Sequence, residues 1–221
     1  AYYYNKSTGE TSWDKPDADV SKAFVPATKL FNLVTSKVNP DQFVKQGGIS
    51  SLISMTNMLL GTSGEESKAA ILSSLETLES IAKQNCQKCL DKGAIEMLID
   101  TLNKYPDDPD IVNTCATILE KLSRSPEGKI AIANSEILSK IIEILKNNPT
   151  NQIAGKAIVS TLDHLCSDVN SVGQVAANAS GSAAIQRYIT ANPDDTQSQA
   201  AADRVLHATS LRNRKSTVTL E

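Results

Sequence analysis

Matching residues recur along this chain at intervals of just over forty positions. The motif Gly47-Gly48-Ile49 is followed 46 residues later by Gly93-Ala94-Ile95. Three apolar residues each stand eight positions before a proline: Leu98, Ile141 and Ile185. Four leucines align in a second helix of the unit: Leu78, Leu119, Leu162 and Leu206. Such a period is typical of repeat proteins, in which each unit buries its apolar face against its neighbours. We therefore expect an array of similar units.

Within each unit the apolar residues have the spacing of an α-helix. The second and third units carry the clearest stripes: Ile111, Val112, Cys115, Ile118, Leu119 and Leu122; Ile153, Ala154, Ala157, Thr161, Leu162 and Leu165. This spacing places the side chains on one face of a helix, and we expect that face to be buried. Pro106-Asp107-Asp108 and Asn147-Asn148-Pro149 predict breaks between helices, and Asn39 before Pro40 predicts a helix start.

The composition favours an all-α chain. Hydrophobic residues make up 40% of the 221 positions, enough for a core, whereas aromatic residues make up only 4%. The net charge of −3 lacks the basic excess that nucleic-acid phosphates require. The sequence also lacks a run of roughly 18 apolar residues, the length that a membrane span needs. We expect a cytoplasmic protein, with a cytoskeletal or ciliary association left open, that does not bind nucleic acid and does not insert into a membrane.

The segment Cys86-Gln87-Lys88-Cys89 has the two-residue gap of metal-binding and redox motifs. A structural zinc site needs four ligands, and the sequence has neither a second pair nor a histidine nearer than His164. Both cysteines fall in a helical register, whereas a redox pair belongs at a helix start in a βαβ unit. We expect them to be reduced residues of a helical core, with no metal and no cofactor.

The first residues have another character. Tyr2-Tyr3-Tyr4 is an aromatic run, Thr8-Gly9 is a turn signal, and a second short run ends on Trp13 and Pro16. This pattern predicts a β-hairpin. The stretch resembles the second and third strands of a WW domain, with the aromatic triplet, the turn and the closing Trp-x-x-Pro. The first strand of that family is absent and the chain has no initiator Met, so we expect a part of a longer protein.

The WW resemblance implies a binding site for proline-rich segments. In that family a tyrosine of the triplet and the last tryptophan clamp a polyproline II helix, which by position assigns the role to Tyr2 and Trp13. Thr11 and Lys6 complete the expected site, and members that read a PPxY motif carry His where this chain has Lys6. A hairpin without its first strand is marginal in water. An alternative is that these aromatic residues only pack on the next domain.

The units after this motif resemble armadillo repeats, with the glycine turn, three helices a unit and the period in common. HEAT repeats usually lack the glycine turn, and tetratricopeptide repeats have 34 residues a unit. The resemblance implies an all-α, right-handed α-solenoid of three to four three-helix repeats over residues 26–221. Two WW strands at 1–17 and a linker at 18–25 would precede it. We expect a partial helix at 26–38 and a polar capping unit at the other end.

In armadillo proteins the third helices line a groove that holds extended peptides. In nuclear import carriers and catenins an asparagine ladder clamps the peptide backbone, and this chain has other residues at those positions and one turn earlier. The corresponding groove residues are Glu76, Ser80, Thr117, Lys121, Ser160, His164 and Arg204. With neither the amide ladder nor an acidic groove expected, recognition of nuclear-localisation signals is disfavoured. We predict a groove of mixed charge, centred on Lys121 and His164, for a mixed or mildly acidic segment of another protein.

An enzyme is the competing class. The sequence has two histidines, His164 and His207, and contains no P-loop, GxGxxG or HExxH pattern. We therefore expect a non-catalytic interaction scaffold or adaptor. A regulatory or structural module of a cytoskeletal, ciliary or other large assembly is the alternative, because all these roles use the same extended surface. Binding on the convex face is also left open.

Overall fold

The computed structural model describes residues 3–4, 11–12, 40–168, 175 and 180–218, with side chains for 41–168, 175 and 180–211. From residue 40 onward the described chain consists of helices and short connections, which confirms the all-α class. The helices are α2 (Pro40–Lys45), α3 (Gly48–Leu60), α4 (Glu65–Ala82), α5 (Cys86–Asp91), α6 (Ala94–Lys104), α7 (Pro109–Leu122), α8 (Pro126–Ala133), α9 (Ile137–Asn147), α10 (Gln152–Cys166), α12 (Gly181–Ala191) and α13 (Thr196–Val218).

Two short strands precede the helices. The strands β1 (Tyr3–Tyr4) and β2 (Thr11–Ser12) pair antiparallel, with Tyr3 opposite Ser12 and Tyr4 opposite Thr11. The other residues of the expected WW site, Tyr2, Lys6 and Trp13, lie outside the described residues, as does the partial helix expected at 26–38. The WW assignment therefore stays a prediction.

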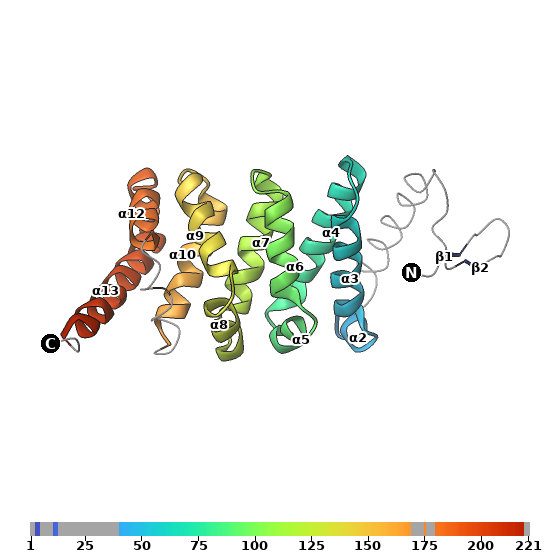
Figure 1. Cartoon of the computed structure of the whole chain (residues 1–221), viewed down its shortest axis with the longest axis horizontal. Helices are drawn as coiled ribbons and strands as arrows, with labels where there is room; N and C mark the ends of the chain where they lie inside the picture. Colours follow the sequence, from blue (N-terminus) through green and yellow to red (C-terminus); the bar gives the residue numbers. More distant parts are fainter. Residues whose placement is uncertain (1–2, 5–10, 13–39, 169–174, 176–179, 219–221) are drawn as a thin grey trace.

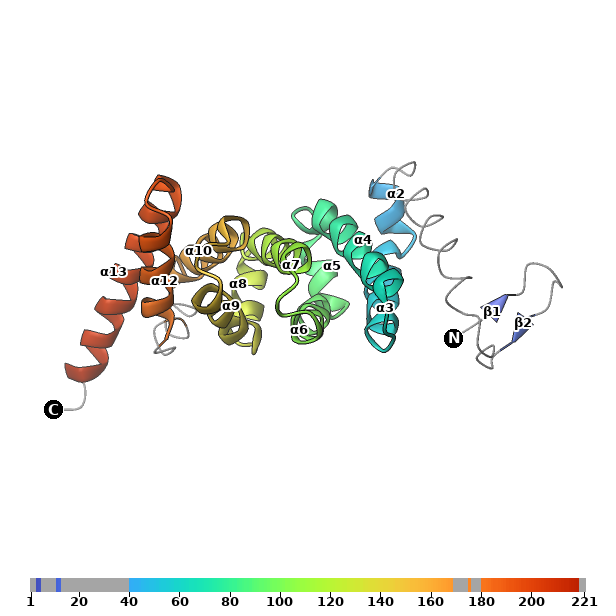
Figure 2. The same cartoon turned by 90° about the horizontal axis from the view of Figure 1, so that it is seen from above.

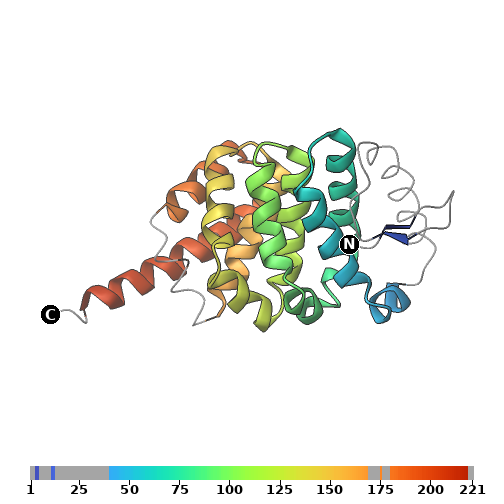
Figure 3. The same cartoon turned by 45° about the vertical axis from the view of Figure 1, so that its right-hand side comes forward.

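The helices follow one another along the long axis of the molecule in three series (Figure 1). The first series consists of the short helices, among which α5 contacts α8. The second series consists of α3, α6, α9 and α12, and each of these helices contacts the next. In the third series α4, α7, α10 and α13 do the same. Figures 2 and 3 show the third series side by side from other directions, with α13 extending beyond its neighbours. Helices about forty residues apart in the sequence are thus neighbours in space.

The third series carries the centre of the core. In α7, Ile111, Cys115, Ile118 and Leu122 have no exposed surface, because α4 covers one side of the helix and α10 the other. Burying one such aliphatic side chain stabilises the fold by about 1.5–3 kcal/mol. The helical stripe predicted for this unit is therefore confirmed. In α10 the prediction fails at Ile153, which is 60% exposed because it faces an open hollow lined by α7, α10 and α13, although the next residue, Ala154, is buried.

Side-chain caps set the starts of three helices. Asp108 accepts a hydrogen bond from the backbone N–H of Ile111 at the start of α7, and Ser125 does the same for Gly128 in α8. Asn151 accepts from the N–H of Ala154 in α10. Each cap satisfies a donor that the helix itself leaves free, worth about 1 kcal/mol. The breaks predicted between α6 and α7 and between α9 and α10 are confirmed.

Two glycines turn the chain from a short helix into the next one. Gly47 before α3 and Gly93 before α6 have φ of 83° and 80°, in the left-handed region. Residues with a Cβ pay a steric penalty there, whereas glycine does not. The predicted turn motif thus marks the same bend in two units.

The cysteines belong to the helical core, as predicted. Cys86 and Cys89 of α5 are buried, and every cysteine is a free thiol. Burial raises the pKa of Cys89 to about 12, so its thiol stays protonated near neutral pH. The Cys86 Sγ lies 2.9 Å from the Ser125 Oγ, which ties α5 to the start of α8.

One aromatic residue holds α12 and α13 against α10. Tyr188 of α12 is fully buried, and its ring fills the space above Gly155, where a Cβ would lie 2.0 Å from the Tyr188 Cε2. The Tyr188 hydroxyl donates to the Asp195 carboxylate at 2.9 Å. Asp195 also accepts from the Ser198 N–H in the first turn of α13. The packing of one ring on a glycine therefore fixes both C-terminal helices.

Gly155→Ala tests this packing. Alanine favours a helix by about 1 kcal/mol over glycine, yet we expect a net loss of stability because the new methyl group overlaps the Tyr188 ring; overpacking of this kind costs about 1–3 kcal/mol. The measurement is thermal and urea unfolding followed by circular dichroism. Gly61→Ala is the matched control, since Gly61 has φ −76° and a Cβ there meets nothing closer than 3.4 Å. An alanine at 155 that is as stable as wild type would contradict the packing.

Candidate functional site

A cavity of about 550 Å³ lies between three consecutive helices of the third series, α7, α10 and α13. It is lined by Thr117, Glu120, Arg124, Ile153, Lys156, Ala157, Ser160, Asp163, His164, Gln197, Ser198, Ala201 and Arg204. Four of the residues predicted from the sequence, Thr117, Ser160, His164 and Arg204, open into it. We call it the α7–α10–α13 cavity.

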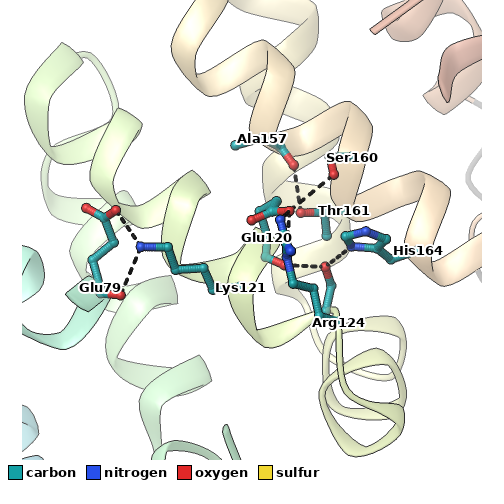
Figure 4. Close-up of polar contacts among 9 residues, drawn as sticks. Glu79, Glu120, Lys121, Arg124, Ala157, Ser160, Thr161 and His164 are labelled. Carbon is teal, nitrogen blue, oxygen red and sulfur yellow. Dashed lines mark hydrogen bonds and ion pairs between the residues drawn. The ribbon is translucent and has the colours of Figure 1, made fainter. Parts of the chain in front are cut away.

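The other three predicted groove residues lie elsewhere. Lys121 turns toward α4, where its Nζ donates to the Glu79 Oε1 at 2.8 Å and to the Glu79 backbone oxygen at 3.1 Å (Figure 4). Glu76 and Ser80 are exposed on α4 and do not line the cavity. The structure therefore separates Lys121 from His164, the two residues on which the predicted groove was centred.

Glu120 connects two walls of the cavity. Its Oε1 accepts hydrogen bonds from Nε at 3.0 Å and Nη2 at 2.6 Å of Arg124, which lies just beyond the end of α7. The same oxygen accepts from the Ser160 Oγ of α10 at 3.3 Å. Figure 4 shows these side chains converging from the two helices. A carboxylate at the boundary of α7 and α10 is thus already satisfied within the chain.

Asp163 and Arg204 connect α10 to α13. Arg204 Nε donates to Asp163 Oδ1 at 3.0 Å, and Arg204 Nη2 donates to Oδ2 at 2.6 Å. This two-bond geometry is the strong form of an arginine–carboxylate pair. Since 61% of the Arg204 side chain is exposed, solvent screens the pair and its net contribution to stability is small. Its main effect is to hold the guanidinium group over the cavity.

Lys156 faces a buried carboxylate, that of Asp195, which directly precedes α13. Its Nζ lies 3.5 Å from Asp195 Oδ1, and the Asp195 side chain is only 6% exposed. Burial by itself would raise the pKa of Asp195, but hydrogen bonds from Ser198 and Tyr188 and the charge of Lys156 lower it instead. Asp195 therefore stays ionised beneath Lys156.

A row of carboxylates runs across the third series. Glu79 in α4, Glu120 in α7 and Asp163 in α10 occupy matching positions 41 and 43 residues apart, and each is bound by a basic side chain. The groove predicted from the sequence contained one acidic residue, Glu76, and none of these three, which the structure adds. These residues stand one position before Ser80, Lys121 and His164, so the repeat register itself contained the signal.

His164 is anchored to α7 by a buried serine. Its Nδ1 lies 2.8 Å from the Ser123 Oγ, and Ser123 has no exposed surface. The Ser123 hydroxyl also lies 2.8 Å from the Glu120 backbone oxygen, which can only accept. The single hydroxyl hydrogen therefore goes to Glu120, and His164 must donate from Nδ1. In the neutral ring the Nε2 is then the acceptor.

This serine–histidine pair is arranged for anchoring and does not suit nucleophilic catalysis. A general base must accept the hydroxyl hydrogen, whereas His164 donates to Ser123. The hydroxyl is also buried, out of reach of a substrate in the cavity. The cavity instead offers charged groups held in place by neighbouring helices, an arrangement that can bind a ligand without chemical change.

The His164 ring sits in a mixed electrostatic field. Burial lowers its pKa below the ordinary value of 6.5, Glu120 and Asp163 raise it, and Arg124 and Lys129 lower it further. The net direction is down. His164 is therefore neutral at pH 7, and a proton there adds a positive charge to the cavity wall.

Comparison of the chain with known proteins gives no family. No family model matches it, and no curated protein does. Within the described part of the chain, no helix is long and apolar enough to cross a membrane. The same residues contain no cluster of three or more histidine, cysteine, aspartate or glutamate side chains that could hold a metal ion.

The pH dependence of stability tests the burial of His164. Because its pKa is lower in the folded than in the unfolded state, the unfolded chain takes up the proton first as pH falls. The free energy of unfolding should therefore be highest above about pH 6.5 and decline as pH drops from there toward the lowered pKa. Urea titrations between about pH 7.5 and pH 5 measure the slope.

His164→Asn keeps a donor near the Ser123 hydroxyl but cannot titrate, so we expect it to flatten this slope. His207→Asn is the matched control, because His207 is exposed on α13 and does not line the cavity. If the His164 variant kept the wild-type slope, another group would be responsible for it.

Proposed function

We propose that this chain is a non-catalytic, armadillo-type interaction module that holds a segment of a partner protein in the α7–α10–α13 cavity. In this proposal residues 26–221 form a right-handed solenoid of three to four three-helix repeats. The cavity belongs to the groove that the third helices of such repeats line. The cytoplasm is the proposed location.

The order of contacts between helices supports the armadillo assignment. A short helix, a glycine at positive φ, a second helix and a long third helix recur in α2–α4 and α5–α7, and α8–α10 keep the same helix order. Each long helix contacts the long helix of the next set. Units that contact only their neighbours in this way are what a repeat array requires.

The single observation that carries the functional proposal is the composition of the cavity wall. Residues chosen from the sequence as groove positions on three successive helices, Thr117, Ser160, His164 and Arg204, meet around one hollow. Two further cations, Arg124 and Lys156, and one exposed apolar side chain, Ile153, stand beside them. A surface that presents charged and apolar groups together suits a peptide segment, which offers both kinds of side chain.

The N-terminal strand pair supports a second, separate binding element. In the complete WW domain, Tyr2 and Trp13 would clamp proline-rich motifs, with Thr11 and Lys6 at the edge of the site. The antiparallel pairing of Tyr3–Tyr4 with Thr11–Ser12 is the strand arrangement that this proposal needs. A chain that includes the family's first strand should bind proline-rich peptides, and Trp13→Ala should abolish that binding in a fluorescence titration.

Site-specific photo-crosslinking tests the groove. A benzophenone side chain at Gln197, which is exposed and lines the cavity, should capture a partner protein from extracts of the native cell. The same group at Lys88, exposed on α5 away from the cavity, is the matched control. Mass spectrometry of the crosslinked peptides then identifies the captured segment.

The expected result is a partner segment attached through position 197 and missing at position 88. Adding unlabelled wild-type chain in excess should suppress the crosslink, because both compete for the same partner. A partner captured from Lys88 and not from Gln197 would place binding on the other face of the array and overturn the proposal.

A further inference from the structure

The cavity wall has its cations outside and its carboxylates beneath them. Half of the Arg124 side chain is exposed, against 13% for its partner Glu120. Arg204 is 61% exposed against 21% for Asp163, and Lys156 is 53% exposed against 6% for Asp195. A ligand that approaches from solvent therefore meets three positive groups before it meets a negative one.

Both arginines leave one edge of the guanidinium group outside their ion pairs. Arg124 and Arg204 each use Nε and Nη2 to reach the carboxylate. The Nη1 amino group lies outside the edge of the planar group that Nε–H and Nη2 form. Its N–H groups point away from the paired carboxylate, where they can donate to a second anion.

The exposed layer of the wall is positive. Arg124, Lys156 and Arg204 are balanced in number by Glu120, Asp163 and Asp195, but the cation is the more exposed partner in each of the three pairs. Each carboxylate holds its cation in place, so a ligand anion finds the donors already oriented. Preorganisation of this kind reduces the ordering cost of binding.

An apolar surface lies at the other end of the same cavity. Ile153 is 60% exposed there, next to Ala157 and Ala201 in the lining. Positions 153, 157, 160 and 164 follow one face of α10, so the wall changes from apolar to polar along the helix. One ligand could therefore place an apolar and a charged side chain on the wall together.

We propose that the α7–α10–α13 cavity binds an acidic peptide segment, whose carboxylates bridge Arg124, Lys156 and Arg204 and whose neighbouring apolar side chain packs on Ile153. This inference rests on the proposed function and names the chemistry of its partner. A basic segment fits less well. Its cations would meet Arg124, Lys156 and Arg204 first, and to reach Glu120 and Asp163 they would have to displace the arginines already bound there.

His164 makes this binding depend on pH. The ring is faced by Glu120 from α7, Arg124 just beyond the end of α7, Lys129 from α8 and Asp163 on its own helix, and Ser123 holds its Nδ1. A bound carboxylate favours the protonated ring, so binding draws a proton onto His164. By linkage the affinity for an acidic segment rises as pH falls through the pKa of the bound state.

The test uses fluorescence anisotropy with three labelled peptide pools of equal length, each mixing leucine at random positions with glutamate, glutamine or lysine. We expect the glutamate pool to bind, and the glutamine and lysine pools to bind at least about tenfold more weakly, the factor that corresponds to one lost charge-assisted hydrogen bond. Affinity should also fall as salt concentration rises. Glutamate binding no stronger than glutamine binding would overturn the proposal.

Variants locate the site. Arg124→Gln combined with Arg204→Gln should weaken glutamate-pool binding at least about tenfold, whereas Arg187→Gln on α12, an exposed arginine outside the cavity, should not. Circular dichroism checks that each variant folds. Calorimetry near pH 6 should show proton uptake on binding, and His164→Asn should remove it. Binding that survives the double variant would overturn the assignment to this cavity.

The outcomes separate this inference from the proposed function. If the lysine or glutamine pool binds best and the double variant alters that binding, the cavity is a peptide site and only its acidic specificity is wrong. If the glutamate pool does not bind, yet the Gln197 crosslink captures a partner segment, the acidic class is again wrong while the groove function holds. Failure of the crosslink as well removes both.

Discussion

The packing of each long helix between two others is the constraint on which the rest of the structure depends. The helix α7 has α4 on one side and α10 on the other, and α10 in turn has α7 and α13. A helix with a single apolar stripe can bury that stripe against only one neighbouring helix. Because these helices pack between two neighbours, they carry apolar residues around much of their circumference. Only a narrow polar strip remains uncovered, and the strips of neighbouring helices lie side by side.

That alignment explains why the charged residues interact across helices. Side chains about forty positions apart in the sequence meet because their helices are neighbours, as Lys121 meets Glu79 and Arg204 meets Asp163. The pairs are partly exposed and contribute little to stability. Their consequence is geometric, because each carboxylate orients a cation at the surface. The C-terminal wall depends further on Tyr188, whose fit above Gly155 sets where α12 and α13 lie.

The helices and their ends followed from local chemistry and could be predicted. Proline and aspartate at the start of α7, and glycine at positive φ before α6, affect the backbone only within a few residues. Their effect on the helix ends can therefore be predicted from the sequence. Burial was less predictable. Ile153 fits the apolar period of α10 but is exposed, because it lines the open α7–α10–α13 cavity, whereas Ala154 beside it is buried. Periodicity predicts which face a residue occupies, and the extent of the partner decides whether that face is covered.

For the candidate site, the repeat register by itself determined which residues share a face of the third helices. From this register we predicted Thr117, Ser160, His164 and Arg204 as groove residues, and all four line the cavity. Only the tertiary structure decided which charges pair, since Lys121 could turn toward either neighbouring helix and turns to Glu79. Side-chain direction on a helix surface depends on the partners that packing supplies, and those partners lie some forty residues away. The period of a chain can therefore be read from sequence, whereas the pairing of its charges is settled by the distances between helices.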